Sequence, residues 1–140
     1  MREIKFRAWN IQKKEFNNSY LHLELNGELL SMNYSQLDGY ESNVSDLYIL
    51  MQFTGLHDKN GIEIYDKCVL NKKTTFDNNM SDKRFQLDTQ INVGFENGCF
   101  VDKNTGVSLY DKMMTITSYP RKTWTEYEIV GTELENPELL

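Results

Sequence analysis

The sequence predicts a mainly β fold of short antiparallel strands with little helix, and two observations support this prediction. Asn-Gly pairs lie between segments of strand-like composition at residues 26–27, 60–61 and 97–98. Asn-Gly is the strongest short hairpin signal, because both residues tolerate the positive φ of a type I′ turn. Several segments also alternate apolar and polar residues with period two, as half-buried strands do.

The Asn-Gly pairs predict hairpins in order along the chain. The first spans residues 20–32, where LHLEL alternates cleanly before the turn. The second joins TQINVGF, residues 89–95, to CFVDK, residues 99–103. The third would pair residues 46–55 with residues 62–70, which are the apolar-rich segments on either side of Asn-Gly at 60–61.

The remaining segments add strands and little else. KFRAW at residues 5–9 and WTEYEIVG at residues 124–131 alternate with period two and predict strands. Helical turns fit residues 38–47 and the terminal NPELL, because Pro137 suits the first position of a helix. The polar segment 71–83 predicts a loop.

Length and composition indicate one soluble domain. The chain has 140 residues, of which 39% are hydrophobic and 26% charged, as is ordinary for a globular protein. The first ten residues, MREIKFRAWN, lack the apolar stretch of a secretion signal, and the longest apolar run, LYILM, is too short to span a bilayer. We therefore expect a cytoplasmic protein with no membrane contact, in which Cys68 and Cys99 are reduced, buried thiols.

The net charge of -6 is unevenly distributed. Residues 1–20 carry five basic and two acidic side chains, whereas residues 21–50 carry five acidic side chains and no Lys or Arg. The acidic total argues against general nucleic-acid binding but leaves a local basic patch near the start as an alternative.

The stretch HDKNG, residues 57–61, looks most like a functional site, because its polar residues separate two apolar-rich segments. It does not fit a calcium loop, in which ligands alternate before the glycine and a distal glutamate follows. It does not fit a phosphate loop either, because one glycine precedes a strand-like segment instead of a helix. Asp, Asn and Gly are residues that turns select, so a turn without a ligand is the prediction.

No arrangement of residues indicates catalysis or a metal. His22, His57, Cys68 and Cys99 are scattered, whereas structural zinc ligands come in closely spaced pairs. There is no G-x-S-x-G nucleophile motif. Paired carboxylates such as Glu126 with Glu128 and Glu63 with Asp66 exist, but charges at period two on a strand are typical of its solvated face. We therefore expect no enzyme activity, catalytic residue, metal or cofactor.

Three segments resemble one known family. IKFRAW at residues 4–9, LMQFTGLHDKNGIEIY at residues 50–65 and ENPELL at residues 135–140 are similar to the recurring segments of the YopX family of small phage and prophage proteins. The resemblance covers both ends and the middle of the chain. It implies an SH3-like β-barrel with an additional N-terminal β region, and an accessory protein without an assigned activity.

The resemblance implies no site residues, and it carries one departure. The family usually continues EIY with E-G-D, whereas this chain has Asp66, Lys67 and Cys68, so the tight bend expected at the glycine is in doubt. The chain is expected to form one domain over residues 1–140, with an N-terminal lobe 1–46 packed on a barrel 47–140 as the alternative within it.

Function is predicted at the level of binding. The leading hypothesis is a noncatalytic module in the host cytoplasm that binds a host or phage protein, with contact between copies of the chain as another use. The alternative is a nucleic-acid accessory protein that uses Lys5, Arg7 and Trp9 on one strand face. Alternation places Trp9, Tyr65 and Trp124 on polar faces, where aromatic side chains anchor interfaces. The candidate contact residues are therefore Lys5, Arg7, Trp9, Tyr65 and Trp124.

Overall fold

The structure is a computed structural model that describes residues 3–18, 20–32, 41–77, 84–114 and 123–140. The predicted mainly β class is confirmed: antiparallel strands dominate, and one sheet curls into a half-barrel. The SH3-like detail stays an expectation. The chain divides into two compact units, which are the described residues of Met1–Ile4 with Phe53–Leu140 (unit 1) and Lys5–Gln52 (unit 2).

Unit 2 holds two small groups of strands. Strand β1 pairs with β2 on one side and with the first half of β6 on the other, while β4 lies between β3 and β5. The elements are β1 (Phe6–Asn10), β2 (Glu15–Phe16), β3 (Leu21–Leu23), β4 (Leu29–Met32), β5 (Glu41–Asn43), the 3-10 helix η1 (Ser45–Leu47) and β6 (Tyr48–His57). The buried apolar side chains of this unit are Ala8, Trp9, Leu29 and Met51.

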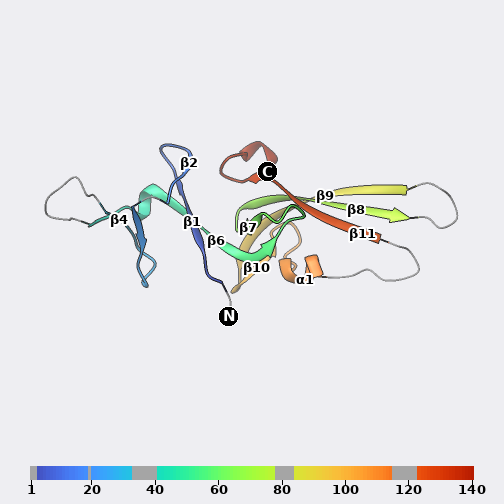
Figure 1. Cartoon of the computed structure of the whole chain (residues 1–140), viewed down its shortest axis with the longest axis horizontal. Helices are drawn as coiled ribbons and strands as arrows, with labels where there is room; N and C mark the ends of the chain where they lie inside the picture. Colours follow the sequence, from blue (N-terminus) through green and yellow to red (C-terminus); the bar gives the residue numbers. More distant parts are fainter. Residues whose placement is uncertain (1–2, 19, 33–40, 78–83, 115–122) are drawn as a thin grey trace. The chain divides into compact units, whose positions relative to one another are not determined.

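Unit 1 is built on a four-stranded antiparallel sheet in the order β10-β9-β8-β11 (Figure 1). Its elements are β7 (Glu63–Tyr65), β8 (Cys68–Asp77), β9 (Arg84–Glu96), β10 (Cys99–Asp102), the helix α1 (Leu109–Met114), β11 (Thr123–Thr132) and the 3-10 helix η2 (Pro137–Leu139). β6 continues into this unit and pairs with β7. The fully buried core includes Ile64, Leu70, Ile91, Val93 and Leu109.

Two predicted hairpins form as expected, and the third is correct in part. β3 with β4 and β9 with β10 are hairpins, and Asn97 and Gly98 both have positive φ (50° and 80°), as a type I′ turn requires. β6 pairs with β7, but Cys68 to Leu70 belong to the other sheet. The predicted helical turn at NPELL is confirmed as η2, with proline at its start.

The loop predicted at residues 71–83 is wrong for residues 71–77. These residues continue β8 and pair with both β9 and β11, so neighbouring strands satisfy their main-chain groups. Residues 78–83 lie outside the described residues. Helix α1 was not predicted, and of the predicted helical segment 38–47 the described part forms β5 and η1, while residues 38–40 lie outside it.

The family's glycine is replaced by Lys67 in this chain, which put the tight bend there in doubt. The bend is nevertheless present. Lys67 has a φ of 65°, the left-handed region that glycine adopts without strain. Its N–H donates to the Val93 carbonyl at 2.8 Å, and its carbonyl accepts from the Glu133 N–H at 2.9 Å. The bend is therefore fixed by neighbouring segments, although a lysine occupies it.

We expect Lys67→Gly to raise the free energy of unfolding by up to about 1 kcal/mol, because glycine relieves left-handed strain. Gly61→Ala is the matched control in the opposite direction. Gly61 has a φ of 79° with no heavy atom within 4 Å of an added Cβ, so backbone strain alone should cost about 1 kcal/mol. Urea unfolding measures both; a destabilised Lys67→Gly protein would show that lysine is not strained.

Candidate functional site

The HDKNG segment is a hairpin turn, as predicted, and its aspartate is buried. Gly61 N–H donates to the Asp58 carbonyl at 3.0 Å, and Asp58 N–H donates to the Ile62 carbonyl at 2.9 Å. Oδ1 of Asp58 accepts from the N–H groups of Asn60 at 2.8 Å and Ile62 at 3.0 Å. These bonds close a three-residue turn whose glycine takes the left-handed conformation.

The same aspartate also fastens the turn to β11. Oδ2 of Asp58 accepts from the N–H of Ile129 at 3.1 Å, and the N–H of Lys59 donates to the Tyr127 carbonyl at 2.8 Å. Lys59 Nζ lies 3.1 Å from Glu128 and 3.7 Å from Glu126. Both carboxylate oxygens of Asp58 are therefore engaged by the protein's own main chain, which supports a structural role.

The pKa of Asp58 is lowered. Burial by itself raises the pKa, but hydrogen bonds from the N–H groups of Ile62, Ile129 and Asn60, together with the charge of Lys59, outweigh it. The ionised carboxylate is thus the form that the fold holds.

A second buried carboxylate, Asp102, closes the loop between β10 and α1. Its side chain is 1% exposed, forms an ion pair with Lys112 Nζ, and accepts from the Asn104 N–H at 3.0 Å and the Thr105 hydroxyl at 3.2 Å. Burial opposes the charge, but these partners prevail and lower the pKa of Asp102. Every oxygen has a partner, so this cluster too is structural.

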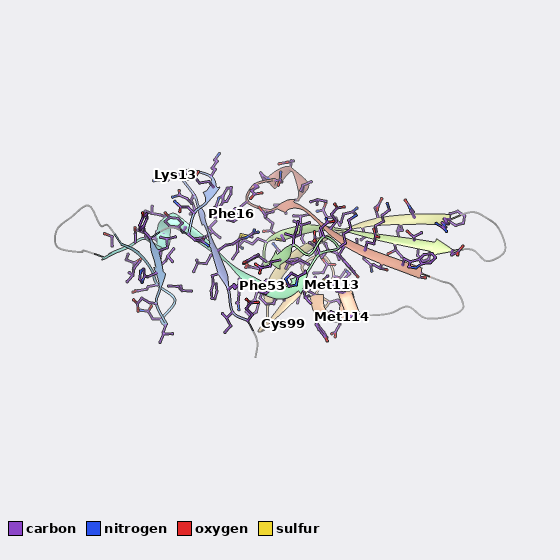
Figure 2. The ribbon with its side chains drawn as sticks, in the orientation of Figure 1. Lys13, Phe16, Phe53, Cys99, Met113 and Met114 are labelled. Carbon is purple, nitrogen blue, oxygen red and sulfur yellow. The ribbon has the colours of Figure 1, made fainter. Side chains whose placement is uncertain are left out.

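The candidate residues of unit 2 lie on or next to β1. Lys5 and Arg7 are half-buried, and the Arg7 guanidinium lies 4.3 Å from the centre of the Phe16 ring (labelled in Figure 2). Trp9 is 7% exposed and meets the same ring edge-on at 4.9 Å. The expected polar-face position of Trp9 is wrong, because strict alternation fails on β1: Ala8, Trp9 and Asn10 are all buried.

The candidate residues of unit 1 fall into two environments. Tyr65 is buried, and its hydroxyl donates to Glu63 Oε2 at 2.9 Å, so its expected exposure is also wrong. Trp124 is 47% exposed, as alternation predicted, with the Arg84 guanidinium 5.9 Å from its ring centre. The structure brings no two of the predicted aromatic contacts together within one unit; their binding role stays a prediction.

Both cysteines are free, but their environments differ. Cys68 is fully buried, as predicted from its place among core residues. Cys99 is exposed at the start of β10, so its expected burial is wrong, and its thiol donates to the Glu96 carbonyl at 3.5 Å (Figure 2). A turn directly precedes Cys99, so no core element covers its side chain.

We expect one thiol to react rapidly with a thiol reagent in the native protein and two to react in denaturant, because access limits the reaction of Cys68. Cys99→Ser should remove the rapid phase. A slow Cys99 or a rapid Cys68 would contradict the burial described here.

The sheet β10-β9-β8-β11 extends beyond the core as three strands whose exposed surface has no role in the fold described so far. We name residues 71–77, 84–90 and 123–128 the arm; they form three adjacent strands that extend side by side in Figure 1. Successive residues point to opposite faces of a sheet. The inner face, continuous with the core residues Leu70 and Ile91, carries Lys72, Thr74, Phe76, Phe85, Leu87, Thr89, Thr123, Thr125 and Tyr127. The outer face carries Asn71, Lys73, Thr75, Asp77, Arg84, Gln86, Asp88, Gln90, Trp124, Glu126 and Glu128.

The inner face exposes apolar side chains to solvent, set among threonines and Lys72. Phe85 is 57% and Leu87 is 56% exposed, whereas the outer face at the same positions is mostly polar or charged. A groove of about 280 Å³ runs over the inner face and reaches Lys112 on α1. Lys72 is the one charged residue that the arm itself places in this groove, and among the described residues no carboxylate lines it.

One protein-family model matches nearly the whole chain. A model described as YopX protein matches residues 5–140. The chain belongs to the YopX family. The structure of protein EF1440 from Enterococcus faecalis resembles that of this YopX-family chain, with 22% sequence identity, a TM-score of 0.60, and coverage of 100% of this chain and 99% of that one. This similarity concerns the fold. No curated protein matches the chain.

In the described ranges, His, Cys, Asp and Glu side chains nowhere gather in threes as metal ligands do. Among those same residues, no helix has the length and apolar character needed to cross a membrane. The predicted strands at residues 89–95 and 124–131 are present, but sequence reasoning missed the parts of the arm at residues 71–77 and 84–88. The alternation of Phe85, Leu87 and Ile91 in RFQLDTQI was a readable signal for a strand beginning before residue 89.

Proposed function

We propose that this chain is a noncatalytic phage or prophage accessory protein that binds a protein partner in the host cytoplasm, using the inner face of the arm. The observation that carries the proposal is a pair of exposed apolar side chains, Phe85 and Leu87, side by side on the inner face of a sheet whose outer face is mostly polar or charged apart from Trp124. Exposed apolar patches rimmed by polar residues commonly mark protein contacts. Family membership supports the phage association.

The chemistry of the groove suits a protein more than a nucleic acid. Threonine hydroxyls and apolar side chains line most of it, with Lys72 and Lys112 as its cations. Lys112 is already paired with Asp102. A groove for nucleic acid needs several cations along the phosphate backbone.

Nucleic-acid binding through Lys5, Arg7 and Trp9 is the weaker proposal. Base stacking needs an accessible aromatic face, whereas Trp9 is largely buried against Phe16. Arg7 also lies over the Phe16 ring, at 4.3 Å from its centre.

The test is affinity purification of the tagged chain from cells that carry the phage, with and without nuclease. Thr125→Arg places a long charged side chain in the groove, and Thr75→Arg, on the outer face of the neighbouring strand, is the matched control. We expect a protein that the wild type and Thr75→Arg retain, that Thr125→Arg loses at least tenfold, and that nuclease does not release. If both variants retained the partner equally, the groove would not be its binding site. Release of the partner by nuclease would favour the nucleic-acid alternative.

A further inference from the structure

Strand β9 is an edge strand over part of its length. β10 pairs with it at Val93 to Glu96, leaving its first residues bonded to β8 alone among the described strands. The direction of its main-chain groups follows from two contacts. The Asn92 carbonyl accepts from Lys103 N–H at 2.8 Å, and the Gln90 carbonyl accepts from Asn104 Nδ2 at 3.3 Å, both on the side away from β8.

Main-chain groups of alternate residues in a strand point to the same side. The N–H and C=O groups of Arg84, Gln86 and Asp88 therefore also point away from β8. No residue in the described part of the chain hydrogen-bonds to these outward groups of Gln86 and Asp88. All seven residues from Arg84 to Gln90 are exposed.

Such an edge is a template for another strand. Proteins usually protect an exposed edge with proline, a bulge or charged side chains, lysine above all. RFQLDTQ contains no proline, glycine or lysine, and its two charges, Arg84 and Asp88, are of opposite sign. The β8–β9 pairing over this stretch has no register shift that would twist the edge away. The free edge is therefore suited to pairing with another strand. The sequence of the edge indicates which strand that is.

We propose that β9 pairs with β9 of a second copy of this chain, antiparallel, about a two-fold axis at Gln86. In this register Arg84 lies opposite Asp88 of the other copy, and Asp88 opposite its Arg84. Phe85 lies opposite Leu87 of the other copy, and Leu87 opposite its Phe85. Two ion pairs on the outer face and two apolar pairs on the inner face thus form at once, each of a kind that stabilises adjacent strands.

The register also satisfies the main chain. Arg84, Gln86 and Asp88 all have outward main-chain groups, so each faces a residue whose groups point toward it. A register centred on Leu87 would instead place Arg84 opposite Gln90, whose carbonyl already accepts from Asn104. In that register Arg84 and Asp88 would not lie opposite one another, so neither ion pair would form. Within one chain Arg84 lies opposite Asp77 and Asp88 lies opposite Lys73 on β8, and the Arg84 guanidinium lies 5.9 Å from the centre of the Trp124 ring. The two side chains therefore turn toward the edge when the copies pair, and the complementary charges of Arg84 and Asp88 favour a second copy and this register.

Pairing of this kind joins the three strands of the arm to those of the other copy in one six-stranded sheet, β11-β8-β9-β9-β8-β11. The exposed Phe85 and Leu87 of both copies become neighbours on one inner face. Self-association neither requires nor excludes the proposed protein partner, since the groove extends from β9 over β8 and β11.

The test exchanges the charges at the two ends of the register. Arg84→Asp places like charges opposite one another in both pairs, and so does Asp88→Arg. We expect the wild type to reach twice the mass of one chain by sedimentation at rising concentration, and each single variant to dissociate about tenfold more readily. The combined variant Arg84→Asp/Asp88→Arg should recover the dimer, because it restores both pairs with their signs reversed.

Mixing separates this register from every other explanation. Arg84→Asp pairs with Asp88→Arg through two opposite-charge contacts, so the two variants should form a mixed dimer although each alone is impaired. Circular dichroism and urea unfolding of each variant establish that it is folded. The purified chain suffices, so the result does not depend on the groove or its partner.

Three outcomes would overturn the proposal. One is a wild-type chain that stays monomeric up to about 1 mM, where even weak pairing would appear. Another is a dimer whose mass none of the charge changes affects, which would place the contact elsewhere. The third is folded single variants that fail to form the mixed dimer.

Discussion

Lys112→Met is expected to lower the free energy of unfolding by about 3 kcal/mol, because it leaves the carboxylate of Asp102 charged and buried without its cation. The Asp102 side chain is 1% exposed and that of Lys112 is 15% exposed, so little water reaches the pair. Methionine keeps most of the lysine's apolar stem, which confines the change to the charge. Urea unfolding near neutral pH measures the loss.

Lys103→Met is the matched control for this ion pair. Lys103 Nζ lies 2.7 Å from Glu133 Oε1, and the side chains are 43% and 13% exposed, so water reaches this pair more readily than it reaches Lys112 and Asp102. We expect less than about 1 kcal/mol from its loss. Adding Asp102→Asn to Lys112→Met should recover part of the stability, since it removes the buried charge. Equal losses for the two lysines would contradict the role of burial.

Asp58→Ala is expected to cost about 3 kcal/mol as well, for a different reason. The carboxylate accepts from three main-chain N–H groups, those of Asn60, Ile62 and Ile129. Its removal leaves donors without acceptors in a buried place, and each costs on the order of 1 kcal/mol or more. Asn60→Ala, whose side chain holds no contact in this turn, should cost far less. A mild effect of Asp58→Ala would mean that water replaces the carboxylate.

Stability should also depend on pH below about 4. The pKa of Asp58 and that of Asp102 are both lowered in the folded protein, so the folded state binds these protons less tightly than the unfolded state does. Their contribution is present above the unfolded value of about 3.9 and is lost as the pH falls through the folded pKa. The slope of unfolding free energy against pH should be shallower in Asp58→Ala; an unchanged slope would exclude Asp58 as a source.

Short sequence patterns correctly predicted those elements whose conformation depends on residues close in the sequence. All three Asn-Gly pairs form turns with a left-handed glycine, but only Asn97 with Gly98 has positive φ at both residues, as a type I′ turn requires. The outer-face position of Trp124 follows from period two, because β11 is regular there. The same rule fails for Trp9, since consecutive residues at the end of β1 are all buried, which no periodicity reveals.

The candidate site was less predictable because it depends on pairing between distant segments. KKTTF, residues 72–76, is rich in polar residues and lacks the apolar content of a core strand. It is a strand because β9 and β11 lie on either side of it. Likewise, nothing in HDKNG shows that Asp58 binds Ile129, and the motif describes the turn but not the strand to which it is fastened.

That fastening bears on how the chain folds during synthesis. The hydrogen bond from Ile129 to Asp58 spans 71 positions, so the aspartate is translated long before its last donor exists. Until β11 emerges, the carboxylate has its two local donors and one oxygen left to water. Contacts of such sequence separation slow folding, because the intervening chain must be ordered first. Unit 1 is therefore expected to complete its folding only after β11 has emerged from the ribosome. The turn at Asp58 would form early, and its hydrogen bond to β11 would form last.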